Sequence, residues 1–132
     1  MIFDPIANMI SIIKNGYLAN KDSVQFPYSS YKERIAKVLE RENFLKKVEV
    51  KKDEKTGHQV ISVNLVYHNK KPVLTEIKQV SKPSRKIYVP FSKVPKVLGG
   101  LGFSVISTPQ GVFSTKEARK KHLGGEIICH IW

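Results

Sequence analysis

The chain has 132 residues, of which 41% are hydrophobic and 26% charged, and this composition predicts one folded domain or two small ones rather than a disordered basic tail. With 23 Lys and Arg against 11 Asp and Glu, the formal net charge is +12, which favours a polyanionic partner. A single cysteine excludes an internal disulfide framework. Without a long apolar run or a signal-peptide layout at its start, the chain is expected to be cytoplasmic, with no membrane segment.

The first half of the chain is predicted to fold as α-β-α-β-β. Asp4 and Pro5 are typical of a helix N-cap followed by a proline in the first turn. The spacing of Ser30 and Glu33 is that of a capping box, which would start the second helix. The predicted elements are a helix that ends at 20–22, a strand at 23–26, a helix from 30 to about 43, and strands at 45–52 and 59–67 that flank a turn at 53–57.

The polar segment 68–72 contains a proline and predicts a boundary between two small α/β domains, residues 1–70 and 71–132. The second domain is predicted to be mainly β with short helices, so the expected fold class is α+β. Its predicted elements are strands at 73–80 and 86–89, a helix at about 92–98, a strand at 103–108, a turn at 109–111, a helix opened by a capping box at 114–117 and closed by Gly124 and Gly125, and a strand at 126–132.

The last strand alternates two kinds of side chain. Its expected buried face carries Ile127, Cys129 and Ile131, and its other face carries Glu126, His130 and Trp132. Catalysis is disfavoured, because a thiol among isoleucines is most often a core side chain and the four histidines are scattered without metal-ligand spacing. The carboxylates are dispersed too. We therefore expect no enzyme activity, no metal or cofactor, and no small-molecule substrate.

The net charge is unevenly divided along the chain. Residues 1–66 hold 11 basic and 8 acidic side chains, whereas residues 67–132 hold 12 basic and 3 acidic ones, a net charge of +9. So few acids leave the cations of the second half without internal partners, and their self-repulsion costs stability. Nucleic acid is the commonest polyanion that would relieve it, ahead of anionic membrane and acidic protein surfaces.

A polar turn in the second half is the best candidate site. Ser107, Thr108 and Gln110 offer hydroxyl and amide groups to phosphate, sugar or base edges, and Gly111 allows close backbone approach. An ordinary turn also needs such residues, so the turn by itself decides nothing. Basic neighbours favour binding, because strands that share a sheet would place them on either side of the turn. These neighbours are Lys82, Arg85 and Lys86 with Tyr88, and Arg119, Lys120 and Lys121.

Gly124, Gly125 and Glu126 are expected beside this turn, since a glycine pair lets the start of the last strand approach another backbone. Cations would then form a rim that holds phosphates around an uncharged, base-reading centre. Such a surface suits shaped RNA, whose sugar hydroxyls and splayed bases are read by short polar side chains and by stacking. No predicted helix carries a clean basic face for the major groove of DNA.

Several segments occur in a specific combination and order. They are GFSVISTPQGV at 102–112, EARKK at 117–121 and GGEIIC at 124–129, preceded by DPIANMI at 4–10, KNG at 14–16, VSKP at 80–83 and IY at 87–88. Together they closely resemble bacterial small-subunit ribosomal protein eight, over nearly the whole chain. The chain departs from the family pattern at Ile12, at Ser84, where glycine is common, and at Phe113, where methionine or leucine is usual.

The resemblance implies a structural constituent of the ribosome with two α/β domains. It implies a primary binder of the central domain of 16S ribosomal RNA that helps to assemble the 30S platform near ribosomal proteins five and twelve. The RNA contacts that it implies come mainly from the second domain, at Ser107, Thr108, Gly111, Gly124, Gly125 and Glu126, to which the residue pattern adds Gln110, Lys86 and Tyr88. Those it implies for the first domain fall on Asn15, Ser30, Lys32 and Lys55.

Two other classes stay open at this point. A general nucleic-acid-binding module, including a DNA-binding one, is predicted from the charge of the second half alone. An RNA-processing enzyme would bind the same polyanion and also cleave or modify it. Competition between RNA and duplex DNA separates the first class from a specific RNA binder, because a purely electrostatic binder shows little preference at raised salt.

Overall fold

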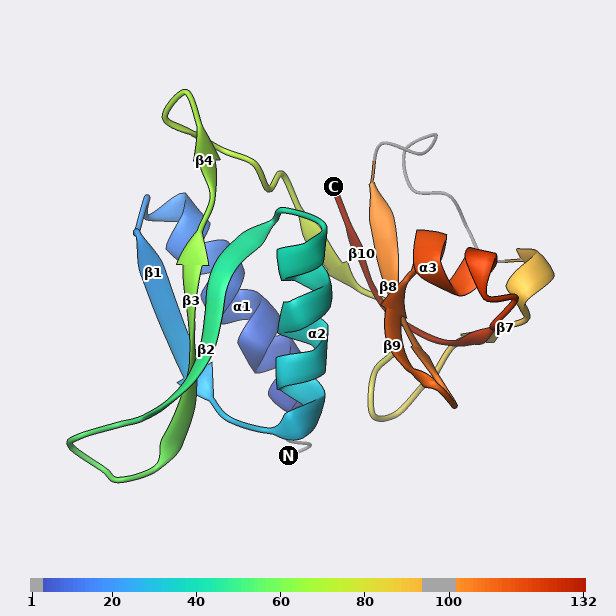
Figure 1. The fold of residues 1–132 in the computed structure, drawn as a ribbon, viewed down its shortest axis with the longest axis horizontal. Coiled ribbons are helices and arrows are strands. Elements are labelled where there is room, and N and C mark those ends of the chain that lie inside the picture. The colour runs from blue at the N-terminus through green and yellow to red at the C-terminus, as the bar shows by residue number, and fades with distance from the viewer. Residues whose placement is uncertain (1–3, 94–101) are drawn as a thin grey trace. The chain divides into compact units, whose positions relative to one another are not determined.

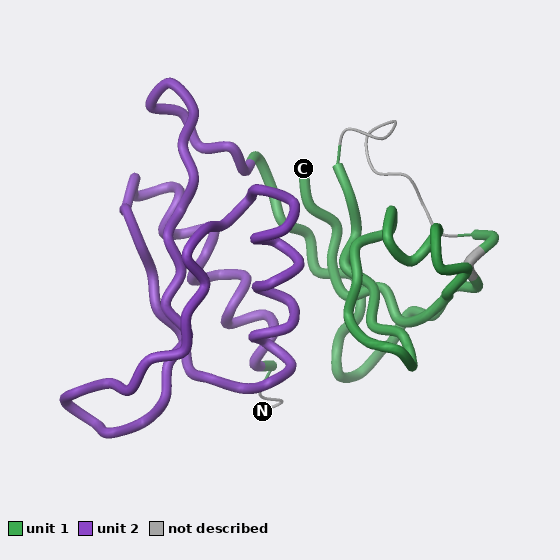
Figure 2. Tube along the Cα trace, viewed as in Figure 1, with its two compact units in different colours: residues 1–4, 75–132 green, residues 5–74 purple. Residues whose placement is uncertain are grey.

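The computed structural model describes residues 4–93 and 102–132, which form helices packed on antiparallel sheets (Figure 1). The predicted α+β class is therefore confirmed. The chain divides into two compact units, one made of residues 5–74 and the other of residues 75–132 with Asp4 (Figure 2).

In the unit of residues 5–74, two helices lie on one side of a three-stranded antiparallel sheet (Figure 1). The central strand pairs with both of the others, in the order β1-β3-β2. The predicted order α-β-α-β-β is thus confirmed. The elements are α1 (Pro5–Leu18), β1 (Ser23–Pro27), α2 (Ser30–Arg41), β2 (Leu45–Lys52) and β3 (Gln59–Leu65).

The largest apolar side chains of this unit are shielded from water. Phe26 of β1, Ile35 and Val38 of α2, and Ile61 and Val63 of β3 are each at most 2% exposed. Ile61 and Val63 alternate along β3, and they contribute to one core because every second residue of a strand faces the same side of the sheet. Burial of such side chains is worth about 1.5–3 kcal/mol each.

The hydroxyl of Tyr17, on α1, joins two distant parts of the backbone. It donates to the carbonyl of Phe44 and accepts from the backbone N–H of Val66 at 3.0 Å. The ring packs edge-on against Tyr67, with the ring centroids 5.6 Å apart. Burial raises the pKa of Tyr17 above its usual value. The side chain thus ties the helix to the segments that leave α2 and β3.

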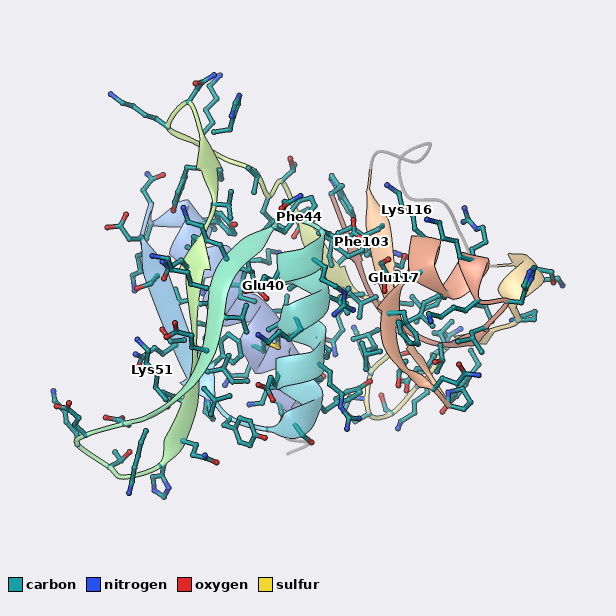
Figure 3. The ribbon with its side chains drawn as sticks, in the orientation of Figure 1. Glu40, Phe44, Lys51, Phe103, Lys116 and Glu117 are labelled. Carbon is teal, nitrogen blue, oxygen red and sulfur yellow. The ribbon has the colours of Figure 1, made fainter. Side chains whose placement is uncertain are left out.

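Strand β2 carries a bulge that α2 stabilises. Its pairing with β3 shifts after Lys46, and Lys47 has a positive φ of 51°. The backbone N–H of Val48 donates to Glu40 Oε2 at 2.9 Å, and Lys37 Nζ donates to the Val48 carbonyl at 3.2 Å. Figure 3 shows Glu40 on α2, beside β2. Side chains of the helix therefore satisfy backbone groups that the bulge takes out of the ladder.

The segment where a domain boundary is predicted forms a short hairpin within the unit of residues 5–74. Strand β3 ends at Leu65, two residues earlier than predicted. Strands β4 (Tyr67–His68) and β5 (Lys71–Pro72) then pair across Asn69 and Lys70, whose φ angles are 51° and 65°. Positive φ at both loop positions is the geometry of a type I′ turn.

With these unit bounds, the net charge is even. Residues 75–132 with Asp4 hold 10 basic and four acidic side chains, and residues 5–74 hold 13 basic and seven acidic ones, so each unit has a net charge of +6. The division differs from the predicted split because Lys70 and Lys71 belong to the hairpin and Asp4 belongs to the other unit. Charge alone therefore does not single out one unit as the binding unit.

The unit of residues 75–132 is built around one long strand, β10. It pairs on one edge with β8, which pairs in turn with β9, and on its other edge with both β6 and β7. The elements are β6 (Ile77–Gln79), β7 (Tyr88–Val89), the 3₁₀ turn η1 (Phe91–Lys93), β8 (Phe103–Thr108), β9 (Gly111–Ser114), α3 (Thr115–Lys120) and β10 (Gly125–Ile131).

The strands predicted at 73–80 and 86–89 are shorter in the structure, as β6 and β7. Both pair with the same edge of β10 at separate places, and the chain leaves the sheet between them in a tight turn bridged at Lys82 and Arg85. The helix predicted at about 92–98 begins where η1 is found. The rest of that prediction lies outside the described residues.

A small apolar core joins α3 to the sheet. Ile106 of β8, Ala118 of α3 and Ile127 of β10 are buried together. Val80, Val89 and Phe113 pack against them. The helix thus covers the face of the sheet on which Ile106 lies.

Ile127, Cys129 and Ile131 are buried as predicted, but they do not share one face of the sheet, because β10 contains a bulge. Ile127 pairs with Ile106, but Cys129 pairs with Val105, so Ile128 is an extra residue. One extra residue reverses the alternation. Ile127 therefore lies on the opposite face from Cys129 and Ile131, and His130 lies on the opposite face from Glu126.

The structure confirms one of the two predicted capping boxes and shifts the other. Ser114 caps α3, and its Oγ accepts from the backbone N–H of Glu117 at 3.3 Å. For α2, the N-cap is Ser29 rather than Ser30, and its Oγ accepts from Lys32 N at 3.1 Å. Adjacent serines are equally good caps, so residue type does not distinguish them.

The α-helices within residues 4–93 and 102–132 end in the same manner. The residue after the C-cap has a positive φ: Asn20 after α1, Asn43 after α2 and His122 after α3. In each case the next residue donates a backbone hydrogen bond back to the last turn, as in a Schellman motif. The prediction that Gly124 and Gly125 close α3 is therefore wrong. His122 closes the helix, and the glycine pair leads into β10.

Candidate nucleic-acid interface

Three predicted site residues form a row across adjacent strands. Glu126 of β10 pairs with Ser107 of β8 on one side and with Tyr88 of β7 on the other. Directly paired residues project from the same face of a sheet. The tyrosine side chain is 67% exposed. The row thus presents an aromatic ring, a carboxylate and a hydroxyl on one face.

Gly125 brings two of these strands unusually close. A β-carbon added at Gly125 would lie 2.1 Å from the carbonyl oxygen of Ser107, which no larger residue could tolerate without a backbone shift. The predicted close approach of the glycine pair to another backbone is therefore present, and Gly124 directly precedes it in the chain. Glycine here sets the spacing between Ser107 and Glu126.

The hydroxyl of Thr108 holds the turn between β8 and β9. It donates to the carbonyl of Gly111 at 2.8 Å and accepts from the backbone N–H of Gln110 at 3.2 Å. Its single hydrogen is therefore already used within the turn. Thr108 shapes the turn, and Pro109 and Gln110 are left exposed at its tip.

The ring of Phe113 lies against Gly111, at the end of this turn. Gly111 has a φ of +138°, which side-chain-bearing residues rarely adopt, and its α-carbon faces the ring of Phe113. Lys121 Nζ lies 5.3 Å from the centroid of that ring, within the range of a cation–π contact. One cation of the predicted group at 119–121 is therefore linked to the turn through Phe113.

A second turn, at 82–85, leaves the sheet beside Tyr88. Ser81, at its base, accepts from the backbone N–H of Ile87 at 2.9 Å, and Lys82 and Arg85 bond to each other through their backbones. Lys82, Arg85 and Lys86 are exposed. Ser81 is buried and positions the start of this turn. The sequence analysis did not predict this role, although a serine before a proline is a recognisable turn signal.

Three exposed cations, Lys82, Arg85 and Lys86, border this face. Among residues 4–93 and 102–132, no ion pair is formed by any of the three. In the same ranges the hydroxyl of Ser107 makes no hydrogen bond to another side chain. The exposed face thus offers one uncommitted hydroxyl among uncommitted positive charges.

The four site residues predicted in the first half come from α1, from α2 and from the turn between β2 and β3 in the unit of residues 5–74. Asn15 is exposed on α1, where it lines a shallow surface hollow with Lys21 and Gln25. Ser30 begins α2 and Lys55 lies in the exposed turn between β2 and β3. The side chain of Lys32 is only 5% exposed, and burial lowers its pKa. The structure does not gather these residues into one patch.

The described residues offer little for catalysis. In residues 4–93 and 102–132, no three His, Cys, Asp or Glu side chains are grouped to hold a metal ion. The prediction that Cys129 is a core side chain is confirmed, and burial raises the pKa of its thiol to about 12. A thiol that stays protonated is a poor nucleophile.

No helix in residues 4–93 and 102–132 is long and apolar enough to cross a membrane.

Comparisons with known proteins decide the family. A family model described as Ribosomal protein S8 matches residues 4–132. The small ribosomal subunit protein uS8 of Syntrophus aciditrophicus is 45% identical over 98% of this chain and 97% of its own length. The uS8 proteins of Thermodesulfovibrio yellowstonii and Staphylococcus saprophyticus are 41% and 43% identical, with at least 98% of each chain covered. The chain belongs to the ribosomal protein S8 family.

Membership of the S8 family makes the chain a structural, non-enzymatic constituent of the small ribosomal subunit. RNA binding and a role in translation follow from the family. The predicted resemblance, the exclusion of an enzyme and the assignment to the small subunit are confirmed.

The structure accommodates two of the residues at which the chain departs from the S8 pattern. Ser84 lies in the turn at 82–85 without a positive φ, so the turn does not require the glycine that the family commonly has there. Phe113 places its ring against Gly111 and under Lys121. The larger aromatic side chain is therefore accommodated behind the turn.

Proposed function

We propose that this chain is a primary binder of 16S ribosomal RNA, which attaches to the central domain of that RNA and helps to assemble the 30S platform near ribosomal proteins five and twelve. Family membership supports the ribosomal setting. The row of Tyr88, Glu126 and Ser107, next to the turn at 108–111, carries the assignment of the site.

Each member of the row suits a different feature of RNA. An exposed tyrosine ring stacks on an unpaired base, an interaction worth about 1–3 kcal/mol per base. A carboxylate repels phosphates but accepts hydrogen bonds from ribose hydroxyls and base amino groups. The free hydroxyl of Ser107 can donate to an acceptor of the RNA. The combination favours folded RNA with splayed bases over a regular duplex.

The backbone of the RNA is held by the surroundings of the row. Lys86, with Lys82 and Arg85 of the adjacent turn, supplies positive charge that is not neutralised internally. Gln110 and the backbone of Gly111 lie at the tip of the other turn, and Gly124 and Gly125 at the entrance of β10. Residues 71–132 would then make the primary contacts. Residues 1–70 would make secondary ones through Asn15, Ser30, Lys32 and Lys55.

The proposal is tested by replacing Tyr88 with alanine in the full chain and titrating it with 16S RNA by filter binding at fixed salt. We expect the affinity to fall about 10-fold or more, equivalent to ~1.4 kcal/mol, because a stacked base loses its platform. Tyr28→Ala is the matched control, since Tyr28 is an exposed tyrosine of the other unit. Equal affinities of Tyr88→Ala and the wild type would refute the site.

Competition with duplex DNA of equal length tests the RNA assignment separately. A binder that reads folded RNA keeps its preference for 16S RNA when the salt concentration is raised. A general nucleic-acid module would lose that preference, because its affinity is electrostatic and falls equally for both polymers.

A further inference from the structure

A basic hollow lies on the opposite face of the same sheet from the row of Tyr88, Glu126 and Ser107. It has a volume of about 380 Å³ and is lined by the cations Lys78, Lys82 and Arg85, by Gln79, Val80 and Ile87, and by His130. These residues come from the segment between β6 and β7, including the turn at 82–85, and from β10. Lys82 and Arg85 belong to the predicted basic rim, but Lys78 and His130 were not predicted as site residues.

The bulge at Ile128 places His130 and Glu126 on opposite faces of the sheet. Lys78 pairs with His130, and His130 pairs with Ser104 of β8, so these three residues share a face. Ser104 and Ser107 are three residues apart on β8 and face opposite sides. Without the extra residue in β10, His130 and Glu126 would lie on the same face. The fold therefore presents a polar patch at a different place on each face of one sheet.

The cations of the hollow are close together and unneutralised. Within 4–93 and 102–132, no carboxylate forms an ion pair with Lys78, Lys82 or Arg85. The carboxylate of Asp4 is engaged instead by Gln79, whose Nε2 donates to Asp4 Oδ2 at 2.8 Å. Lys78 also acts on His130, whose pKa is lowered by burial and by the charge of this lysine. Grouping like charges without a counterion costs stability, and a bound anion would recover it.

His130 adds a hydrogen-bond donor to this charge. The buried hydroxyl of Ser104 contacts His130 Nδ1, and within the described ranges it has no other side-chain partner. Because a buried hydroxyl needs an acceptor for its hydrogen, it donates to Nδ1. The neutral ring then carries its proton on Nε2, which is a donor. Val80 and Ile87 supply an apolar wall of the kind that a ribose can contact.

We propose that this hollow binds a phosphate of the RNA backbone, so that RNA contacts both faces of the sheet in residues 75–132. The inference rests on the proposed RNA-binding function. Cations supply the charge for the phosphate and the imidazole supplies a neutral donor. An RNA strand bound here passes the edge of the sheet that β6 and β7 form, next to the turn at 82–85. That turn borders both faces of the sheet.

The test uses the salt dependence of 16S RNA binding by the full chain with Lys78→Gln, because Lys78 is the cation of the hollow that has no place beside the row. The logarithm of affinity falls with the logarithm of salt concentration by about 0.7–0.9 for each phosphate that is neutralised. We expect the variant to lose about one such increment of slope. Lys71→Gln removes the same charge from the exposed hairpin and serves as the matched control. A slope equal to that of the wild type, or an equal loss in the control, overturns the proposal.

A second measurement uses inorganic phosphate in place of RNA and follows the ring signals of His130 by NMR. Saturable shifts in the wild type that are absent from the Lys78→Gln variant support the site. Shifts of equal size in both proteins overturn it. The outcome is separable from that of the Tyr88→Ala titration, because loss of a stacking contact lowers affinity at every salt concentration without changing the slope. If Tyr88→Ala binds RNA as tightly as the wild type while the Lys78 variant shows a reduced slope, only the assignment of the row is refuted.

Discussion

The α-carbon of Gly125 faces the carbonyl oxygen of Ser107 so closely that a β-carbon on it would lie 2.1 Å from that oxygen. Two strands of the sheet meet at this point, and the residues beside it, Glu126 and Ser107, are directly paired. The absence of a side chain therefore determines how the proposed RNA-contacting row is spaced.

Replacing Gly125 with alanine should destabilise the protein by roughly 1–3 kcal/mol, because the strands must move apart to admit the methyl group. Urea unfolding of the full chain measures this change. Ser84→Ala, in an exposed turn, is the control and should change the free energy of unfolding by less than ~0.5 kcal/mol. If Gly125→Ala unfolds at the wild-type urea concentration, the close approach is not present in solution.

Thr108 and Ser107 should respond differently to loss of the hydroxyl. Thr108→Val removes both hydrogen bonds of the turn and should cost about 1 kcal/mol of stability as well as RNA affinity. Thr108→Ser keeps the hydroxyl and should retain both the stability and the RNA affinity of the wild type. Ser107→Ala should lower RNA affinity and leave the unfolding transition unchanged. Equal stability of Thr108→Val and Thr108→Ser would contradict the role given to this hydroxyl.

Lys70 occupies the second position of a two-residue turn with a φ of 65°. Glycine adopts this conformation without the steric cost that a side chain imposes, so Lys70→Gly should stabilise the protein by about 1 kcal/mol. Lys71→Gly, in strand β5, should instead destabilise it by roughly 0.5–1 kcal/mol. Both values come from urea unfolding at neutral pH, and a destabilised Lys70→Gly variant would argue against the type I′ geometry.

Tyr17 should make stability depend on alkaline pH. Because its pKa is raised above 10.0 in the folded protein, the folded state holds this proton more tightly than the unfolded state does. The stabilisation is complete below pH 10 and is lost as the pH rises through the folded pKa. Tyr17→Phe leaves the Phe44 carbonyl and the Val66 N–H without their partner and should cost roughly 1–3 kcal/mol at pH 7.

Unfolding experiments at pH 7 and above pH 10 test this account of Tyr17. The difference in stability between the wild type and Tyr17→Phe should shrink at the higher pH. Tyr28→Phe, at an exposed tyrosine, serves as the control, since its hydroxyl is not buried. A difference that stays constant across this range would contradict the burial of the Tyr17 hydroxyl.

Local patterns in the sequence predicted the regular elements well, because their periodicity and caps are properties of neighbouring residues. The strand at 45–52, the strand at 103–108 and the cap at Ser114 were all predicted with the bounds that the structure has. The bulge at Ile128 was not, since it depends on how β10 pairs with β8. That single residue reversed the predicted faces of His130 and Ile127.

The candidate site could be predicted in part for the same reason. Ser107, Gly111 and Gly125 are recognisable from a turn and a glycine pair, but their alignment with Tyr88 follows from strand order. Thr108 was expected to donate a hydrogen bond to RNA, but its hydroxyl donates to the carbonyl of Gly111 within the turn. The hollow around Lys78 and His130 is invisible in the sequence, because those residues are 52 positions apart.

The central claim is that RNA contacts the row of Tyr88, Glu126 and Ser107 and the turn beside it. Saturation transfer from the ribose protons of 16S RNA fragments to the backbone amides of the deuterated, ¹⁵N-labelled full chain tests it directly. We predict the largest loss of signal at the amides of Ser107, Gln110, Gly111 and Tyr88. Full signal at these four amides in the bound complex, with losses elsewhere in the chain, would contradict the claim.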